Sequence, residues 1–169
     1  MRVLILTISD STFGADRQDT SGEAIQLWCA RRDDEVVAHL YVPDESTQIS
    51  SVLVEWCDSG KTDLIVTTGG TGLAPRDVTP EATLAVIERE VPGISEYIRM
   101  NSAMRFPKAT LSRGVSGIRG ATLIINLPGS TTGVQDGLSS IMPIVDHAID
   151  ILTGNTTRHD TPWSNPMVR

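Results

Sequence analysis

The stretch of sequence that decides the fold is DLIVTTGGTGLAPRDVTPE, which runs from Asp63 to Glu81. It opens with apolar and β-branched residues, the pattern of a parallel strand buried on both faces of its sheet. Glycines at 69, 70 and 72 follow at once and allow the backbone to turn tightly and approach a ligand closely. Thr79 and Pro80 then supply a helix cap and a proline for the first helical position, with an acid behind them. The stretch therefore predicts a strand, a loop able to contact a ligand, and a helix.

The same alternation of strands and helices extends through the chain in both directions. Apolar runs predict strands at residues 3–8, 36–42, 63–68, 110–115 and 122–127. Apolar residues at helical spacing predict helices at 21–32 with Ser21 as cap, at 49–56, from 79 to the break at Val91-Pro92-Gly93, at 94–105 and, as one long closing helix, at 134–152. This order predicts a three-layer α/β fold, a mostly parallel open sheet with helices on both faces. We expect one domain over residues 1–153 and a polar C-terminal tail over 154–169.

Composition and charge exclude several classes of protein. The 169 residues include 14 Lys and Arg against 21 Asp and Glu, a net charge of −7, and no cluster of basic residues suits nucleic acid. No apolar stretch is long enough to span a membrane, and the run at 3–8 is too short for a signal peptide. Cys29 and Cys57 fall within helical apolar patterns, so we interpret them as buried, unreactive thiols. We therefore expect a cytoplasmic protein that binds neither nucleic acid nor membrane.

Polar and glycine-rich segments follow four of the predicted strands. They are Ser9-Asp10, Pro43-Asp44-Glu45, the loop at 67–80 and the segment at 127–133. Ligands of open α/β sheets bind at the carboxyl ends of the strands, near the point where the strand order reverses, so we expect these segments to meet there. The candidate ligand-binding residues are Ser9, Asp10, Gly69, Gly70, Thr71, Gly72, Arg76, Ser112, Pro128, Gly129 and Ser130.

The glycine-rich loop has the chemistry of a phosphate site. Backbone N–H groups from Gly69 to Gly72 can form a nest for an anion, and the helix that follows adds its dipole. The loop has neither the Gly-Lys-Ser/Thr of a Walker A motif nor the spacing of the dinucleotide fingerprint, and a tight turn that merely connects strand and helix is the alternative. Arg76 could clamp a phosphate or be a solvated loop residue. Ser112-Arg113 could reach a phosphate or belong to an ordinary edge strand.

Asp44 and Asp77 are the carboxylates of interest. Taken singly, Asp44 is a typical turn residue and Asp77 a typical acid beside a helix start. Together they lie at two predicted strand ends that border a glycine nest. Mg²⁺ binds one or two carboxylates together with substrate phosphates and keeps several waters. The pair therefore predicts a Mg²⁺ site formed by Asp44 and Asp77.

The central motif resembles a known signature. Thr67–Gly72 followed by Arg76–Thr83 is similar to the signature of the MogA/MoaB family of molybdenum-cofactor biosynthesis proteins, whose fold also forms the G domains of molybdenum-insertion proteins such as gephyrin. The resemblance covers about residues 2–153. Its further matches are Ile8-Ser9-Asp10, Asp19-Thr20-Ser21-Gly22, Val42-Pro43-Asp44-Glu45, Leu111-Ser112-Arg113, Gly117-Ile118-Arg119-Gly120 and Asn126-Leu127-Pro128-Gly129.

The resemblance implies a cytoplasmic homotrimer with molybdopterin adenylyltransferase activity. In that reaction ATP and molybdopterin give adenylyl-molybdopterin and pyrophosphate, and the product goes on to molybdate insertion, which makes a molybdenum-insertion protein a possible partner. The family's two essential aspartates match Asp44 and Asp77. Mg²⁺ on these acids would neutralise phosphate charge, while Ser9-Asp10 and Pro128-Gly129-Ser130 would close around nucleotide or pterin.

One departure from the family pattern concerns the fourth segment. Many members have a proline after the residue that follows Leu/Met-Pro-Gly, whereas this chain continues with Ser130 and Thr131. The alternative to an enzyme is a non-catalytic molybdopterin carrier of the same fold, and a third possibility is an unrelated nucleotide-binding or scaffold role. Two intact acids favour the enzyme, because binding alone would not require both.

Overall fold

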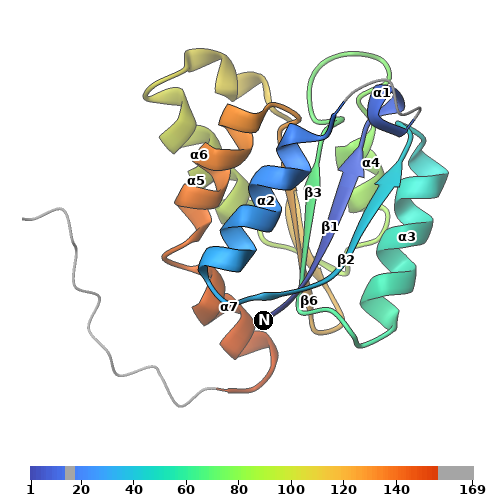
Figure 1. Cartoon of the computed structure of the whole chain (residues 1–169), viewed down its shortest axis with the longest axis vertical. Helices are drawn as coiled ribbons and strands as arrows, with labels where there is room; N and C mark the ends of the chain where they lie inside the picture. The colour runs from blue at the N-terminus through green and yellow to red at the C-terminus, as the bar shows by residue number, and fades with distance from the viewer. Residues whose placement is uncertain (14–17, 156–169) are drawn as a thin grey trace, which may run out of the picture.

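Six strands form one sheet in the computed structural model, which describes residues 1–13 and 18–155 (Figure 1). The strands are β1 (Arg2–Ile8), β2 (Glu35–Val42), β3 (Leu64–Thr68), β4 (Arg89–Glu90), β5 (Ser116–Arg119) and β6 (Thr122–Leu127). Their order across the sheet is β2-β1-β3-β6-β5-β4. The first four in this order are parallel, and β5 and β4 continue the sheet in antiparallel pairing. The prediction of a mostly parallel sheet is confirmed.

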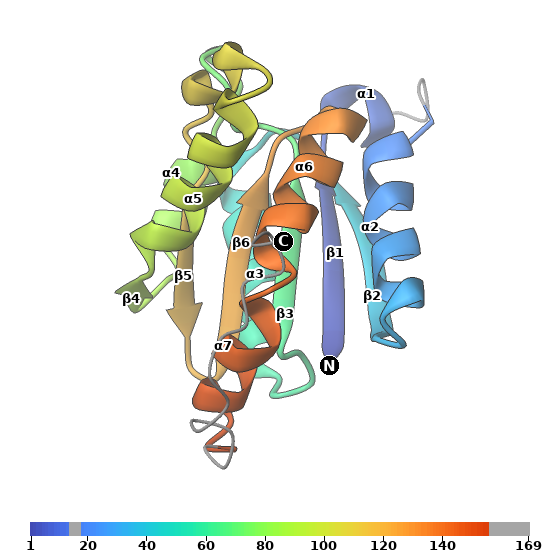
Figure 2. The same cartoon turned by 90° about the vertical axis from the view of Figure 1, so that its left-hand side faces the viewer.

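Helices cover both faces of this sheet. Within the described residues they are α1 (Asp10–Phe13), α2 (Thr20–Arg31), α3 (Ser46–Asp58), α4 (Thr79–Leu84), α5 (Pro92–Ala103), the 3₁₀ helix η1 (Pro107–Leu111), α6 (Thr131–Ile141) and α7 (Val145–Leu152). Figures 1 and 2 show α2, α5, α6 and α7 on one face and α3 and α4 on the other. The predicted three layers are therefore present. None of these helices is both long enough and apolar enough to cross a membrane.

Alternating side chains of the central strands fill two cores. In β1, Val3 and Ile5 pack towards α2 and α6, whereas Leu4 and Leu6 pack towards α3, and all four are completely buried. Burial of each such side chain contributes roughly 1.5–3 kcal/mol, so β1 is held firmly from both sides. Cys29 lies in the first core and Cys57 in the second, and burial raises the pKa of each thiol to about 11. The prediction that both thiols are buried is confirmed, and their raised pKa agrees with low reactivity.

The parallel strands end level with one another. Thr7 of β1 lies beside Thr68 of β3, which in turn lies beside Leu127 of β6, and Ile8 lies beside Val42 of β2. The chain passes from β1 to β2 on one side and then to β3 on the other side of β1, so the strand order reverses between β1 and β3. A crevice forms at the carboxyl ends of strands at such a point.

One predicted strand is wrong. Residues 110–115 form the end of η1 and a loop, and the strand of this region is β5, which begins only at Ser116. Pro107 starts η1, and the Thr110 hydroxyl donates to its carbonyl at 2.8 Å, which stabilises a turn where sequence pattern favoured extension. Ser112 and Arg113 consequently lie on a loop.

The other corrections concern helix ends. The predicted long closing helix is two helices, α6 and α7, because Pro143 between them has no N–H to donate. Asp19, not Ser21, caps α2, and its carboxylate accepts from the Gly22 N–H at 2.8 Å. Thr79 is the first residue of α4 and not its cap, and its hydroxyl donates to the Gly69 carbonyl. The helix predicted from 79 to 91 ends at Leu84, and residues 89–90 form β4 instead. Nearly all of the predicted tail, 156–169, lies outside the described residues.

Candidate active site

The four predicted segments meet at the carboxyl ends of the parallel strands. They surround a cavity of about 240 Å³, here called the strand-end chamber. Its lining consists of Thr7, Ile8, Ser9, Gln18, Asp19, Thr20, Ser21, Asp44, Thr68, Gly69, Gly70, Asp77 and Gly129. These residues follow or end β1, β2, β3 and β6 and begin α2, so the predicted meeting of the strand ends is confirmed.

The glycine-rich loop packs directly on its neighbours. Gly69 and Gly70 have φ values of 101° and 60°, where residues with a side chain are strained. A Cβ at Gly69 would stand 2.0 Å from the Ile8 carbonyl oxygen, and one at Gly70 would stand 2.4 Å from Thr79 Oγ1. The Thr79 hydroxyl donates to the Gly69 carbonyl at 2.9 Å, and the Gly69 N–H donates to the Leu127 carbonyl at 3.2 Å. The Gly69 N–H is thus already bonded to β6.

Asp44 faces the loop from the end of β2. Its Oδ1 lies 2.9 Å from the position of a Cβ at Gly70, so only glycine permits this approach. The Asp10 N–H donates to Asp44 Oδ2 at 3.0 Å, and the Asp44 N–H donates to Asp10 Oδ1 at 3.0 Å. Partial burial raises the pKa of Asp44, and the negative charges of Asp10 and Asp77 add to this effect. The hydrogen bond from the Asp10 N–H and the charge of Arg76 lower the pKa but do not outweigh it. A cation at this carboxylate would relieve that repulsion.

Asp77 faces the same loop from its far end. Its Oδ2 accepts from the Ala74 N–H at 2.8 Å and lies 2.9 Å from the position of a Cβ at Gly72. Asp44 and Asp77 therefore flank Gly70–Gly72 from two sides, as the sequence predicted. Among the described residues, no group of three or more His, Cys, Asp or Glu could hold a metal ion. Two carboxylates with phosphate oxygens from a ligand nevertheless suit Mg²⁺.

Asp10 and Arg76 form an ion pair at the rim of the site. Arg76 donates through Nη2 to Asp10 Oδ1 at 2.9 Å and through Nη1 to Glu45 Oε1 at 2.8 Å. The guanidinium of Arg76, with the Asp44 N–H, lowers the pKa of Asp10. The hydrogen bonds to Asp10 and Glu45 raise the pKa of Arg76 above its usual range. Neither Asp10 nor Arg76 belongs to the described lining of the chamber. A phosphate that bound Arg76 would have to share it with two carboxylates.

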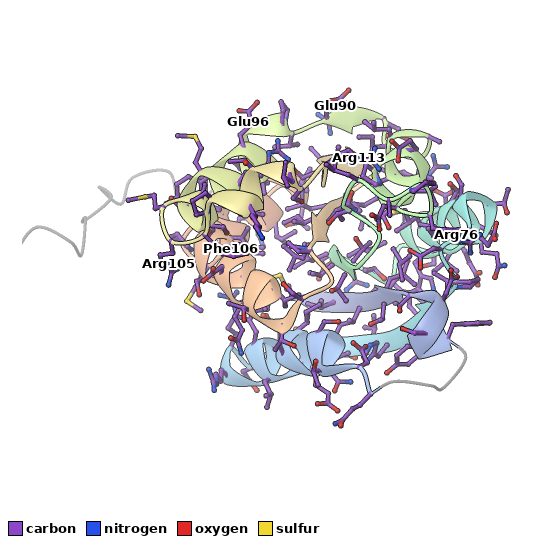
Figure 3. All side chains as sticks on the ribbon, turned by 90° about the horizontal axis from the view of Figure 1, so that it is seen from above. Arg76, Glu90, Glu96, Arg105, Phe106 and Arg113 are labelled. Atoms are coloured by element: carbon purple, nitrogen blue, oxygen red, sulfur yellow. The ribbon has the colours of Figure 1, made fainter. Side chains whose placement is uncertain are left out.

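Arg113 holds the loop that carries Asp77. Its N–H donates to the Thr71 carbonyl at 2.8 Å and its Nε to the Gly72 carbonyl at 2.7 Å. Its other nitrogens bind the Asp77 carbonyl and the Glu81 carboxylate. Figure 3 looks down on this edge of the molecule and labels Arg113. The sequence suggested a phosphate contact for Ser112-Arg113, whereas this guanidinium binds the protein itself.

A larger groove adjoins the chamber. It encloses about 860 Å³, and it shares Gly70, Asp77 and Gly129 with the chamber. We call it the side groove. The predicted residues Thr71, Gly72, Ser112, Pro128 and Ser130 line it. Its remaining lining comes largely from α5, η1 and α6 and consists of Ser102, Arg105, Phe106, Lys108, Ala109, Leu111, Thr132, Gly133 and Asp136.

The two cavities differ in charge and polarity. Acids of the chamber are Asp19, Asp44 and Asp77, with no Lys or Arg in its described lining. The side groove carries both signs of charge, with Arg105 and Lys108 against Asp77 and Asp136, and Arg105 pairs with Asp136 at 2.9 Å. Its apolar walls include Phe106, which Figure 3 labels beside Arg105. Sequence reasoning missed these groove residues, because exposed side chains after α5 give no periodic signal. It also missed Asp19–Ser21 as a wall, although this motif was part of the resemblance.

Comparison with protein families identifies the fold's relatives. The family model described as "Probable molybdopterin binding domain" matches residues 4–147. The chain belongs to this family.

Individual relatives agree with this membership. A Helicobacter pylori protein named molybdopterin adenylyltransferase is 40% identical over 153 residues, which cover 89% of this chain and 87% of that protein. The molybdenum cofactor synthesis protein cinnamon of Drosophila melanogaster is 41% identical over 150 residues, and this chain spans only 25% of its length. The crystal structure of the molybdopterin biosynthesis enzyme MoaB from Thermus thermophilus has a TM-score of 0.86 and 48% identity, covering 96% of this chain and 99% of that one.

Proposed function

We propose that this protein is a molybdopterin adenylyltransferase of molybdenum cofactor biosynthesis, which transfers AMP from ATP to the terminal phosphate of molybdopterin and releases pyrophosphate. Family membership and the names of similar proteins support the reaction class. The observation that carries the proposal is the position of Asp77, which lines both the chamber and the side groove, with Asp44 across the loop. Two adjoining cavities can hold two substrates, and their junction is where the reacting phosphates would meet.

The reaction needs placement more than proton transfer. A terminal phosphate oxygen of molybdopterin attacks the α-phosphorus of ATP, a new P–O bond forms, and the bond between the α-phosphorus and the bridging oxygen breaks as pyrophosphate leaves. The attacking phosphate is already anionic at neutral pH, so no strong general base is required. The loop from Gly70 to Gly72 would orient the phosphates through backbone N–H groups, and in-line placement supplies much of the rate. Ser9 and Ser130 would close the site on either side.

The acidic lining indicates why a cation is needed. Phosphates placed beside Asp44 and Asp77 would be repelled, and the described lining of the chamber offers no Lys or Arg to offset this. Asp44 and Asp77 would hold Mg²⁺ together with substrate phosphates, and the ion would neutralise the charge that develops on them. Partial burial raises the pKa of Asp44, and a cation bound at this carboxylate would favour its charged form.

We also propose the assembly and setting of the enzyme. It is a cytoplasmic homotrimer, as the family resemblance implies, with one domain over residues 1–153, and it delivers its product to a molybdenum-insertion protein. The outer face of α5 exposes Tyr97 and Met100, and Met104, which caps the C-terminal end of this helix, is 86% exposed. These three side chains lie on one face of the helix, because their spacing is three and four residues. We propose this face as a contact between subunits.

Pyrophosphate release tests the proposed activity. The experiment incubates wild type with ATP and Mg²⁺, with and without molybdopterin, and repeats the assay with Asp77→Asn. We expect release that requires molybdopterin and falls by at least about a hundredfold in the variant, because a charge that positions the reacting phosphates is lost. Removal of Mg²⁺ with a chelator should abolish release in the wild type. A folded wild type that binds molybdopterin without any release of pyrophosphate would instead support the carrier.

A further inference from the structure

A buried polar network lies under the wall of the strand-end chamber. Asp19 Oδ1 caps α2 and accepts from the Gly22 N–H at 2.8 Å and the Ser21 hydroxyl at 2.7 Å. Asp19 Oδ2 instead faces the sheet, where the Thr7 hydroxyl donates to it at 2.5 Å and His39 Nε2 lies 3.1 Å away. The side chains of Asp19 and His39 are only 6% and 10% exposed. One carboxylate therefore joins the first turn of α2 to strands β1 and β2.

The surroundings of His39 fix which ring nitrogen carries the proton. The Thr7 hydroxyl gives its proton to Asp19, so His39 Nε2, 3.0 Å from Thr7 Oγ1, must be the donor towards these oxygens. On the other side of the ring, Gln26 Nε2 lies 3.0 Å from His39 Nδ1 and donates to it. The Tyr41 hydroxyl approaches the same nitrogen at 3.4 Å, and its ring stacks on the imidazole. Burial lowers the pKa of His39, although the charge of Asp19 and the hydrogen bond to it act to raise that pKa. The lowered pKa agrees with this neutral form of the ring.

The ring fits against the helix backbone without spare room. A Cβ at Gly22 would lie 2.2 Å from Asp19 Oδ2 and 2.5 Å from two atoms of the His39 ring. Glycine at this position therefore allows His39 to approach the first turn of α2. Burial alone would raise the pKa of Asp19, but the hydrogen bonds from Thr7, Gly22 and Ser21 outweigh it and lower that pKa. The Asp19 carboxylate is thus a charged, fully bonded anchor.

We propose that His39 is a positioning residue for the substrate site. Its Nε2–H, together with the Thr7 hydroxyl, holds the sheet-facing oxygen of Asp19, and this fixes the turn from Asp19 to Ser21 as a wall of the strand-end chamber. Thr20 in the same turn is bonded to Thr131 at the start of α6, at 2.7 Å, so the wall also connects to the segment after β6. The inference rests on the proposed function, since it assigns a substrate to the chamber.

The size of the chamber makes the anchor important for binding. A cavity of about 240 Å³ accommodates only part of a substrate, so a small displacement of one wall changes most of its contacts. Loss of the His39 anchor should weaken substrate binding while the groups around Asp44 and Asp77 remain in place. The expected effect is therefore a rise in KM of about tenfold for the substrate in the chamber, with kcat within about twofold of wild type.

Three variants test the proposal. His39→Phe keeps a flat ring but removes the donor, whereas His39→Gln can present an N–H at the place of Nε2. Tyr41→Phe is the matched control, because it keeps the stacked ring and changes only the weak contact with Nδ1. The first measurement is amide hydrogen exchange of Gly22 without substrate, and the second is KM and kcat for ATP and for molybdopterin.

The proposal predicts that the Gly22 amide proton exchanges about tenfold faster in His39→Phe than in wild type, while exchange at Trp28 in the same helix is unchanged. It also predicts that His39→Phe raises KM for one of the two substrates. His39→Gln and Tyr41→Phe should behave like wild type in both measurements. Unchanged exchange in His39→Phe would overturn the anchor, and faster exchange with unchanged KM values would overturn the role in substrate binding. Exchange is measured without turnover, so an inactive wild type would contradict adenylyl transfer while the exchange result still decides the anchor.

Discussion

Single carboxylates determine much of the chemistry of this site. Asp19 is stabilised by four polar neighbours, whereas Asp44 has a raised pKa because it is partly buried near two other acids. A group held in an unfavourable charged state costs stability in the unliganded protein, which is common where activity requires it. The two aspartates thus differ: hydrogen bonds stabilise the charged form of Asp19, whereas partial burial and nearby acids disfavour the charged form of Asp44.

Replacement of Asp44 by asparagine should therefore stabilise the unliganded protein. The folded protein raises the pKa of this carboxyl above its ordinary value of 3.8, so its contribution to stability is present at low pH and is lost as pH rises through the folded pKa. At neutral pH the charge opposes folding, and its removal should increase the free energy of unfolding by at most about 1 kcal/mol, given partial solvent screening. Denaturant unfolding at about pH 7 and about pH 3 measures this, since the difference between variant and wild type should shrink in acid.

Sequence predicts acids better than it predicts long-range arginine contacts. Asp44 and Asp77 could be found because Asp44 directly follows one predicted strand and Asp77 lies in the glycine-rich loop that follows another. Arg113 could not be assigned, because its partners, the carbonyls of Gly72 and Asp77, lie 41 and 36 residues away in the chain. Its function depends on where a loop after η1 returns to the sheet, and residue spacing does not encode that.

At the scale of elements, the loop between β3 and α4 brings the acids together. Gly69 of the loop packs against the carbonyl of Ile8 at the end of β1 and against Gly129 after β6. Gly70 packs against the carboxylate of Asp44 after β2. A Cβ at either glycine would collide with these neighbours, which is why the loop is rich in glycine. The helix α4 is short, and Thr79 at its start binds the loop rather than capping the helix.

Gly70→Ala should show how tightly the loop is packed. Gly60→Ala is the matched control, because Gly60 has φ of 66°, close to the 60° of Gly70, but no atoms within 4 Å of a new Cβ. We expect Gly60→Ala to lose about 1 kcal/mol of stability from backbone strain alone, and Gly70→Ala to lose about 2–4 kcal/mol together with activity. Denaturant midpoints measure both. Equal losses in the two variants would mean that the contacts with Thr79 and Asp44 are not tight.

Elements with a strong periodic pattern were predicted well, and those that depend on proline or on tertiary contacts were not. The strands from β1 to β3 and β6, and the helices α2, α3 and α5, match their predicted ranges within a few residues. The region at 110–115 was assigned as a strand because β-branched and apolar residues favour extension, and the 3₁₀ turn at Pro107 prevents it. Hydrophobic spacing through residues 134–152 is preserved across the break at Pro143, so periodicity alone could not reveal two helices.

At the scale of the whole molecule, the exposed face of α5 is the surface that a subunit contact would cover. Sedimentation equilibrium of the wild type at micromolar concentration should give about three times the chain mass of 18.2 kDa. Met100→Glu should shift the protein towards the monomer, because it places a charge in an apolar contact. Leu27→Glu on α2, a residue that is 59% exposed, is the matched control and should remain trimeric. A monomeric wild type would refute the proposed assembly.

The fate of each phosphate of ATP tests the central claim most directly. The measurement incubates the wild type with Mg²⁺, molybdopterin and ATP labelled either at the α-phosphate or at the γ-phosphate, and then separates the pterin product. Adenylyl transfer predicts that the α-label moves to the pterin and that the γ-label appears only in pyrophosphate. Label on the pterin from the γ-phosphate would indicate phosphoryl transfer instead. No label on the pterin from either ATP, in a protein that binds molybdopterin, would contradict the account and support a carrier.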